Sequence, residues 1–352
     1  MRISFRKLIL ALSFSMLLIM PMVSWAWGNT GHEAVAYVAW QQMTPAAQAR
    51  AIELLKQVPT LHNADNTKLI AGYAEWVADL PPGLSQDQQN LYLFMRAATW
   101  PDTIKHHWFK DSDTPPAGRT TEVNIGFTDT ESHGYWHFID SGFASDKSTV
   151  PATPVPNAAT QIAALRQFIA SSEDDPLKAY DLVWLEHLVG DVHQPLHGCT
   201  RYYAGSGDEG GNAIKIRLTT AMKKAFEGTL STSAPTELHA FWDDLPGEGQ
   251  PAPALPFAAA FAQRLSPASA TSVADTDPAD WAAESLALAK SDVYRTPIGK
   301  GPKPAISKSN PATSSTSYLI TTTYYNRAIR DANSRVALAG ARLAKLLNEN
   351  LK

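Results

Sequence analysis

The sequence predicts an all-α fold, in which one mostly helical domain carries long surface loops. Apolar residues recur every three or four positions in several segments of the 352-residue chain, which is the period of an amphipathic helix. The alternating pattern of a strand is sparse: the clearest run, NAIKIRL at residues 212–218, predicts one short strand or hairpin. Pro-, Ser- and Gly-rich connectors at 110–131, 151–156 and 299–317 separate the helical segments, as is typical of surface loops.

Capping signals mark where these helices begin. A Ser, Thr, Asp or Asn side chain at the N-cap accepts a backbone hydrogen bond, and proline is favoured at the first helical position. The predicted N-caps are Thr44, Asn157, Asp175 and Asp277, with Asp280 as the alternative to Asp277. Pro176 would be the first residue of the third of these helices, and Pro195 should end it because proline cannot continue a helix.

Two further helices are predicted toward the C-terminus. One follows Pro235 in PTELHAFWDDL, and the other is a long closing helix over 321–351. Apolar residues of the closing helix fall on or near one face, which should pack on the core. They are Ile329, Ala332, Val336, Leu343, Leu346 and Leu347.

The first 26 residues have the three-part layout of a secretory signal. A basic start precedes an apolar run over 8–23 and the triplet Ser24-Trp25-Ala26, which begins and ends with a small residue. The alternative is a membrane anchor, but the run is shorter than the roughly 20 residues that span a bilayer, and Pro21 interrupts it. We expect cleavage after Ala26. This would leave one domain over 27–352, secreted or periplasmic, without a stable membrane anchor.

The composition argues against some classes of function. With 34 acidic and 30 basic residues the net charge is −4, and loss of the three basic residues of the signal segment lowers it to −7. An acidic chain is a poor candidate for capturing phosphate backbones on a basic face, so a phosphate-handling protein of this kind needs another source of positive charge. Cys199 is the sole cysteine, which rules out an intramolecular disulfide. We expect it to be a small buried residue rather than a metal ligand.

The stretch HLVGDVHQPLH carries the strongest chemical signal. His187 and Asp191 are four residues apart on a predicted helix and therefore share a face. Pro195 breaks the helix, so the chain can turn back and bring His197 to the same space. Two imidazoles and a carboxylate form a donor set suited to zinc, although a polar helix end is the alternative reading of one such pair.

The same residue types recur elsewhere in the chain. His239 and Asp243 repeat the four-residue spacing, and His32, His137 and Asp102 add three more candidate ligands. Taken alone, His137 reads as a core histidine and Asp102 as a helix cap. Together with the first motif, these residues supply more candidate ligands than one metal ion binds.

Removal of the signal segment would create one more ligand. Trp27 would then begin the chain with a free α-amine, whose unperturbed pKa is roughly 7.7–8.0. Such an amine can lose its proton to a metal ion, and the carbonyl oxygen of the same residue can chelate the same ion. In an uncleaved chain this nitrogen is an amide and a poor ligand.

These motifs resemble the S1/P1 nuclease family, secreted tri-zinc enzymes related to bacterial zinc-dependent phospholipase C. The motif order and the spacings His-x3-Asp-x5-His and His-x3-Asp agree with the family from Trp27 to Asp243, and the closing AGARLAKLLN is similar as well. The resemblance implies a helical domain with three Zn²⁺ in one cleft. The implied ligands are Asp102, His137, His187 and Asp191 for one zinc, His197, His239 and Asp243 for a second, and the Trp27 amine and carbonyl, His32 and Asp191 for a third.

The resemblance also implies roles beyond the metal ligands. Asp140 would orient the attacking water, Lys105 would hold the phosphate, and Phe138 and Asn212 would line a base pocket. Each has a plainer reading: a turn cap for Asp140, a solvated charge for Lys105, a core side chain for Phe138 and a simple turn at 210–212. No motif position matches the remaining histidines, which are His62, His106, His107, His133 and His193.

The implied function is a zinc-dependent endonuclease that hydrolyses single-stranded DNA and RNA to 5′-nucleotides, with 3′-nucleotidase activity. Three Zn²⁺ would bring the net charge from −7 to −1 and concentrate positive charge in the cleft. Two alternatives stay open, a zinc-dependent phospholipase C and a secreted helical binding protein with structural zinc. The segments 103–136 and 198–238 are longer than in the family's compact form, and we expect these loops to border the cleft.

Overall fold

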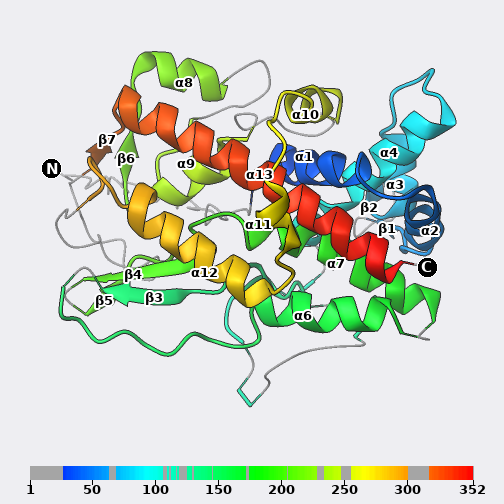
Figure 1. Cartoon of the computed structure of the whole chain (residues 1–352), viewed down its shortest axis with the longest axis horizontal. Coiled ribbons are helices and arrows are strands. Elements are labelled where there is room, and N and C mark those ends of the chain that lie inside the picture. Colours follow the sequence, from blue (N-terminus) through cyan, green and yellow to red (C-terminus); the bar gives the residue numbers. More distant parts are fainter. Residues whose placement is uncertain are drawn as a thin grey trace, which may run out of the picture.

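Helices make up most of the structure (Figure 1). The computed structural model describes residues 27–62, 69–105, 109–110, 112–115, 117–118, 125–128, 131–144, 146–171, 174–203, 205–227, 234–246, 255–299 and 317–351. The proposed signal segment, residues 1–26, lies outside the described residues. The predicted mostly helical class is confirmed. None of the described helices combines the length and the apolar character that crossing a bilayer requires.

The helices follow one another along the chain with only short strands between them. Their bounds are α1 Asn29–Trp40, α2 Pro45–Leu55, α3 Tyr73–Ala78, α4 Gln86–Ala97, α5 Trp100–Thr103, α6 Ala158–Ile169, α7 Asp175–Asp191, α8 Thr220–Glu227, α9 Leu238–Asp244, α10 Leu255–Ala262, α11 Ala270–Ala274, α12 Pro278–Leu288 and α13 Thr322–Asn350. A 3₁₀ turn, η1, spans Gly134–His137, and a π-helical turn, η2, spans Ala289–Val293.

Three of the four predicted N-caps are confirmed. The side chains of Thr44, Asn157 and Asp277 each accept a hydrogen bond from a backbone N–H in the first turn of the helix that they precede. The fourth prediction is wrong by one residue, because Asp174 is the N-cap of α7 and Asp175 is its first helical residue. The Asp175 carboxylate instead pairs with the Arg50 guanidinium of α2, at 2.5 and 2.9 Å.

The helix α7 ends one turn before the predicted breaker. Its last residue is Asp191, four residues before Pro195. Two successive turns follow, in which Gln194 N–H donates to the Asp191 carbonyl and His197 N–H donates to the Gln194 carbonyl. The chain therefore folds back over the end of α7, as the sequence predicted.

Within the described residues the strands are short and pair in three small sheets. They are β1 Leu61–His62 with β2 Leu69–Ala71, β3 Ser141–Ala144 with β4 Cys199–Tyr203 and β5 Ser206–Gly207, and β6 Ile216–Arg217 with β7 Tyr318–Leu319. In the second sheet β3 and β4 are parallel, with Ser141 opposite Cys199. The strand predicted over 212–218 exists as β6, but it pairs in parallel with the distant β7 rather than forming a hairpin.

The segment 198–238 is not simply a loop. It contains β4, β5, β6 and α8, and its residues 204 and 228–233 lie outside the described residues. Much of 103–136 also lies outside them, so the prediction that these segments border the cleft stays a prediction.

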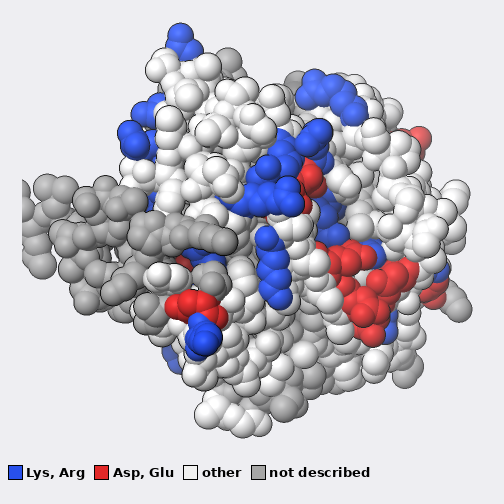
Figure 2. All heavy atoms as spheres, turned by 60° about the vertical axis from the view of Figure 1, so that its left-hand side comes forward, with Lys and Arg blue, Asp and Glu red and all other residues white. Residues whose placement is uncertain are grey.

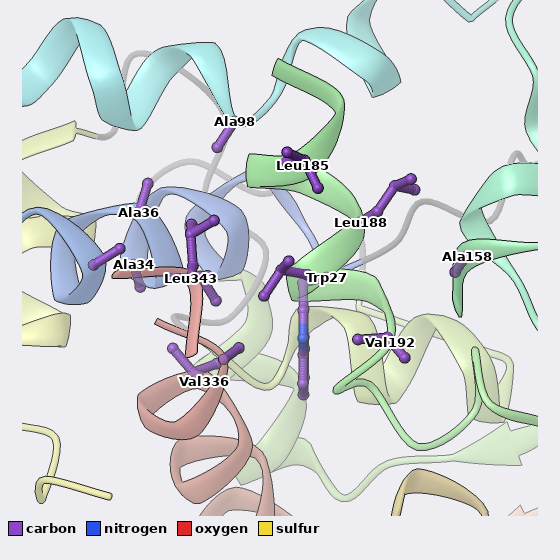
Figure 3. Packing of buried hydrophobic residues seen from close by; sticks show 14 of the residues in the cluster. Trp27, Ala34, Ala36, Ala98, Ala158, Leu185, Leu188, Val192, Val336 and Leu343 are labelled. Carbon is purple, nitrogen blue, oxygen red and sulfur yellow. The ribbon is translucent and has the colours of Figure 1, made fainter. Parts of the chain in front are cut away.

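The core forms where α7 packs with α1, α2, α6 and α13. Every residue of α7 from Ala179 to Asp191 is buried, which is why the helix shows no polar face. Figure 3 shows the Trp27 ring in this core with Leu188, Val192 and Val336. On α13 the predicted apolar residues are buried, except for Ile329, which is partly buried against the core. The polar C-terminal turn of α7 is thereby held inside the protein.

Candidate metal centre

The C-terminal turn of α7 supplies the first two polar side chains of the site. His187 and Asp191 lie one turn apart and are both fully buried. His187 donates its Nδ1–H to the carbonyl of Ala98, which follows α4, at 2.8 Å. This hydrogen bond fixes the imidazole so that Nε2 faces the Asp191 carboxylate, 3.2 Å from Oδ2. Such a carbonyl partner is typical of metal-binding histidines.

Two more residues meet His187 on one side. His137, at the end of η1, places Nδ1 2.9 Å from His187 Nε2 and 3.0 Å from Asp191 Oδ2. Asp102, in α5, places Oδ1 3.8 Å from His187 Nε2 and 3.9 Å from His137 Nδ1. These four buried side chains come from three elements that are far apart in the sequence.

On the other side of Asp191 lies His32 of α1. Its ring stacks on the His187 ring at a centroid distance of 3.8 Å, and its Nε2 is 3.4 Å from Asp191 Oδ1. The helices approach so closely here that a Cβ on Gly190 would lie 2.9 Å from His32 Nδ1. Asp191 thus presents Oδ2 to His137 and His187, and Oδ1 to His32.

A further group lies where the folded-back chain meets α9. His197 donates Nδ1–H to the His137 carbonyl at 2.8 Å, and His239 donates Nδ1–H to the Gly210 carbonyl at 2.7 Å. Their Nε2 atoms face each other at 3.1 Å. Asp243, one turn after His239, places Oδ2 3.4 Å from His239 Nε2 and Oδ1 3.7 Å from His197 Nε2.

The facing nitrogens of His197 and His239 fit a metal ion. Each imidazole donates its Nδ1–H to a carbonyl, so the two Nε2 atoms that face each other would both act as acceptors in the neutral rings. Two nitrogens bound to one tetrahedral zinc at about 2.0–2.1 Å lie roughly 3.3 Å apart, close to the 3.1 Å observed. A cation between them would bind both nitrogens.

Buried polar atoms without a hydrogen-bond partner are a second indication of metal binding in all the groups. Buried polar groups are almost always hydrogen-bonded, yet several ring nitrogens and carboxylate oxygens here have no hydrogen-bond partner. These atoms are both ring nitrogens of His32, His137 Nε2, Asp102 Oδ2, Asp191 Oδ1 and Asp243 Oδ2. Each of the three groups of His and Asp gathers its ligand atoms within 4.8 Å of one another. Imidazole and carboxylate donors in such sets suit zinc.

Burial and charge favour the metal-binding forms of His32, His137 and Asp102. By contrast, burial of His187 and His197 is outweighed by the neighbouring carboxylates, which raise the pKa values of both imidazoles, and burial raises the pKa of Asp243. Burial, with the neighbouring His187, lowers the pKa of His32 to about 4, and burial lowers the pKa of His137 to about 3. Burial opposes ionisation of Asp102, but the Lys105 ammonium and the nearby imidazoles outweigh it and lower the pKa of that carboxyl. Neutral imidazoles and an ionised carboxylate are the forms that bind metal.

Trp27 lies beside these groups. Its side chain is fully buried, and its indole N–H donates to the Gly190 carbonyl at 2.9 Å. The next residue, Gly28, donates its N–H to the Asp243 carbonyl, also at 2.9 Å. The main chain at residue 27 is therefore fixed between the end of α7 and α9.

The two candidate catalytic residues occupy different surroundings. Lys105 is buried and its Nζ is 2.7 Å from Asp102 Oδ1, so the reading as a solvated surface charge is wrong. Asp140 follows η1 with a positive φ of 53° and accepts a hydrogen bond from the Thr200 hydroxyl at 2.8 Å. Thr200 lies on β4, so the Asp140 carboxylate is oriented across two segments rather than within a turn.

Of the two candidate base-pocket residues, Phe138 lies beside the His197–His239–Asp243 group, and Asn212 follows Gly210 and Gly211 in the chain. Phe138 is partly exposed, and its ring centroid is 4.8 Å from that of His197. Asn212 is buried and donates its side-chain N–H to the Glu209 carbonyl at 2.8 Å, as expected of a residue that closes a turn. Its role toward a base stays a prediction.

Sequence reasoning missed Gln194. This buried side chain donates from Nε2 to Asp243 Oδ1 at 2.6 Å, while its Oε1 accepts from Leu196 N–H at 2.5 Å. The Leu196 N–H fixes which way the amide points, so Gln194 must present its donor to the carboxylate. Its position between His193 and His197 in HLVGDVHQPLH could have indicated that it contacts a metal ligand.

Among the remaining histidines, His193 and His133 contribute to packing. His193 donates from Nδ1 to the Val189 carbonyl, and its Nε2 accepts from Arg342 Nη1 at 2.9 Å. The His133 ring stacks on Trp136. His106 and His107 lie outside the described residues. Cys199 is buried, as expected.

Comparison with known proteins agrees with this geometry. The sequence model named S1/P1 Nuclease matches residues 27–352. The chain is similar to "Endonuclease 4" of Arabidopsis thaliana, with 28% identity over 158 residues that cover 42% of this chain and 41% of that protein. It is similar to "Nuclease S1" of Aspergillus oryzae, with 22% identity over 252 residues that cover 70% of this chain and 64% of that protein. Each match therefore spans less than two thirds of the curated relative. The family match covers nearly the whole chain, and the protein belongs to the S1/P1 nuclease family.

Proposed function

We propose that this protein is a zinc-dependent nuclease that hydrolyses single-stranded DNA and RNA to 5′-nucleotides and also acts as a 3′-nucleotidase. The observation that carries the proposal is the gathering of His197 Nε2, His239 Nε2 and the Asp243 carboxylate, in which the two nitrogens face each other at 3.1 Å. Family membership and the names of the two relatives support a nuclease. Burial of the whole donor set supports a metal rather than solvated side chains.

Three Zn²⁺ would be held by the sets that the resemblance implies. The first comprises Asp102, His137, His187 and Asp191, the second His197, His239 and Asp243, and the third the Trp27 amine and carbonyl, His32 and Asp191. The division of the Asp191 oxygens between His32 and the His137–His187 pair supports its place as the shared ligand. Bound zinc would supply a water of lowered pKa and neutralise charge on the phosphate.

The protein's other side chains would position the reactants. Asp140 would accept a hydrogen bond from the attacking water and align it with the phosphorus atom. Lys105, whose ammonium lies beside Asp102, would place its positive charge next to a phosphate oxygen. Phe138, with its partly exposed ring, would stack on an unpaired base. A paired base cannot offer its face in this way, which gives the preference for single strands.

Maturation would complete the third set. Cleavage after Ala26 would place a free α-amine at Trp27, next to the Gly28 N–H that bonds to the Asp243 carbonyl. We expect the mature protein to be secreted or periplasmic. The match of the family model, which begins at residue 27, supports this boundary.

The metal would also explain how an acidic chain binds a polyanion. In the view of Figure 2 the surface carries Lys and Arg side chains near its middle and a gathering of Asp and Glu beside them, rather than one basic face. Three Zn²⁺ would offset most of the −7 charge of the mature chain and concentrate the positive charge at the site.

The test compares substrates and counts zinc. Mature protein should hold three zinc ions by elemental analysis and cleave single-stranded DNA and RNA, leaving 5′-phosphates. Hydrolysis of phosphatidylcholine without DNA cleavage would instead assign a phospholipase C. Asp140→Asn should keep all three zinc ions and lose nearly all turnover, with a measurable residual rate. A zinc-loaded wild type without activity on any phosphodiester would indicate a binding protein with structural zinc.

A further inference from the structure

We propose that Thr200 is a positioning residue for Asp140, and that Gly210 couples this pair to His239. The inference rests on the proposed function, because it assigns a partner to the carboxylate that would align the attacking water. It extends that function to a residue outside the metal ligands and outside the base pocket.

The direction of each hydrogen bond at Thr200 is fixed. The Gly210 N–H can only donate, and it lies 3.2 Å from Thr200 Oγ1. The hydroxyl therefore accepts this bond and has its single O–H free for the Asp140 carboxylate, whose Oδ1 is 2.8 Å away. Because Thr200 is buried, solvent water competes little for either bond. The hydroxyl thus holds one carboxylate oxygen and leaves Oδ2 for the attacking water.

The backbone places the two residues opposite each other. The main chain of Asp140 is bracketed by Ile139 N–H, which donates to the His197 carbonyl, and by Ser141 N–H, which donates to the Gly198 carbonyl. From Ser141 onward, β3 runs parallel to β4, on which Thr200 lies. Asp140 itself adopts a φ of 53°, in the left-handed region that Asp enters more readily than most residues other than glycine. Fixed backbone on both sides and a tethered side chain leave this carboxylate little freedom.

Gly210 extends the connection to the metal ligands. Its N–H donates to Thr200, and its carbonyl accepts the Nδ1–H of His239 at 2.7 Å. A Cβ at this position would lie 2.6 Å from the Leu196 carbonyl oxygen and 3.2 Å from His239 Nδ1, so only glycine fits. One residue therefore sets the orientation of a zinc-binding imidazole and of the hydroxyl that orients Asp140. The attacking water and its metal ions are aligned by the same piece of backbone.

The test removes the hydroxyl while keeping the shape of the side chain. Thr200→Val should lower kcat on single-stranded DNA by about tenfold to a hundredfold, the usual effect of losing a partner that orients a functional group. KM and the zinc content should stay at wild-type values, because Thr200 contacts neither base nor metal. Thr200→Ser keeps the hydroxyl and should restore most of kcat.

A matched control removes a threonine hydroxyl elsewhere. Thr44 caps α2, whose Arg50 contacts the opposite end of α7 from His187 and Asp191. Its hydroxyl also accepts a backbone N–H, that of Ala47. Thr44→Val should therefore lower the melting temperature without changing kcat.

A double-mutant cycle separates positioning from general damage. If Thr200 acts through Asp140, Thr200→Val should cause no further loss in an Asp140→Asn background. The same fold loss in both backgrounds, or wild-type kcat in Thr200→Val, would overturn the inference. Failure of the proposed function looks different, because the zinc-loaded wild type would then cleave no single-stranded nucleic acid at all.

Discussion

Replacement of Gly210 by alanine tests whether its backbone holds the His197–His239–Asp243 group together. Gly210 has a φ of 58° and accepts the Nδ1–H of His239. An added Cβ would meet the Leu196 carbonyl oxygen at 2.6 Å, a separation that real Cβ atoms do not reach. The peptide must shift to relieve this contact, and the shift would carry the carbonyl away from His239.

The expected size of the effect has three parts. A non-glycine residue in the left-handed region costs about 1–2 kcal/mol. Loss of the His239–Gly210 hydrogen bond costs about 1 kcal/mol, and forcing an extra methyl into packed surroundings costs about 1–3 kcal/mol. Together these predict that Gly210→Ala lowers the free energy of unfolding by about 3–6 kcal/mol. The loosened imidazole should also reduce zinc affinity by about tenfold to a hundredfold at this group alone.

Gly205, in the turn between β4 and β5, offers a matched control. It has a φ of 81°, but a Cβ there would have no atom within 4 Å. Gly205→Ala should therefore cost only the backbone term, about 1–2 kcal/mol, and leave zinc binding unchanged. The difference in free energy of unfolding between the two variants therefore measures the cost of the contact with Leu196 and His239.

The assay measures stability and metal content on the same samples. Denaturant unfolding in the presence of a chelator gives the stability of the metal-free protein, and titration against a competing zinc chelator gives the affinity of each site. Equal zinc affinity in folded Gly210→Ala and wild-type protein would refute the reasoning, as would equal stability loss in the Gly205 and Gly210 variants.

Three other changes probe separate parts of the structure. Gln194→Leu leaves the Asp243 carboxylate and the Leu196 N–H without their partner, so zinc should bind the His197–His239–Asp243 group about tenfold to a hundredfold more weakly in chelator competition; unchanged affinity would contradict the assigned contact. Burial opposes ionisation of Glu284, but its bonds to Arg342 and Arg335 prevail and lower the pKa of its carboxyl. The ionised carboxylate therefore contributes fully to the free energy of unfolding above the unfolded-state pKa near 4.3, and this contribution is lost as the pH falls through the lower folded-state pKa. Because Glu284 is more than a third exposed, solvent screens these pairs, and Glu284→Gln should cost only about 0.5–1 kcal/mol in urea unfolding at pH 7. The substitution should also flatten the acid limb of the stability profile, and an unaltered limb would show that the carboxylate does not matter. Acetylation of the Trp27 amine in the mature protein should lower zinc content at saturation from three ions to two by elemental analysis, whereas three retained ions would remove the amine from the proposed ligand set.

The sequence predicted the helices because capping and periodicity are local properties. Thr44, Asn157 and Asp277 each bond to a backbone N–H only two or three residues away, so their roles can be read from the chain. Asp175 was misread because a distant residue, Arg50, takes its carboxylate. In the same way β6 was found as a strand, but its partner β7 lies about 100 residues further on, where no local pattern points to it.

For the site, the sequence determined which residues carry imidazole and carboxylate donors and which of them share a helix face, because four-residue spacing places His187 with Asp191 and His239 with Asp243. Only the tertiary structure decided which ring nitrogen of each histidine faces inward, since the orienting carbonyls of Ala98 and Gly210 lie 89 and 29 residues away along the chain. It also decided the partners of Asp140 and Asp243. Those hydrogen bonds join segments that meet only when the core packs, and no periodicity in a sequence encodes such a meeting.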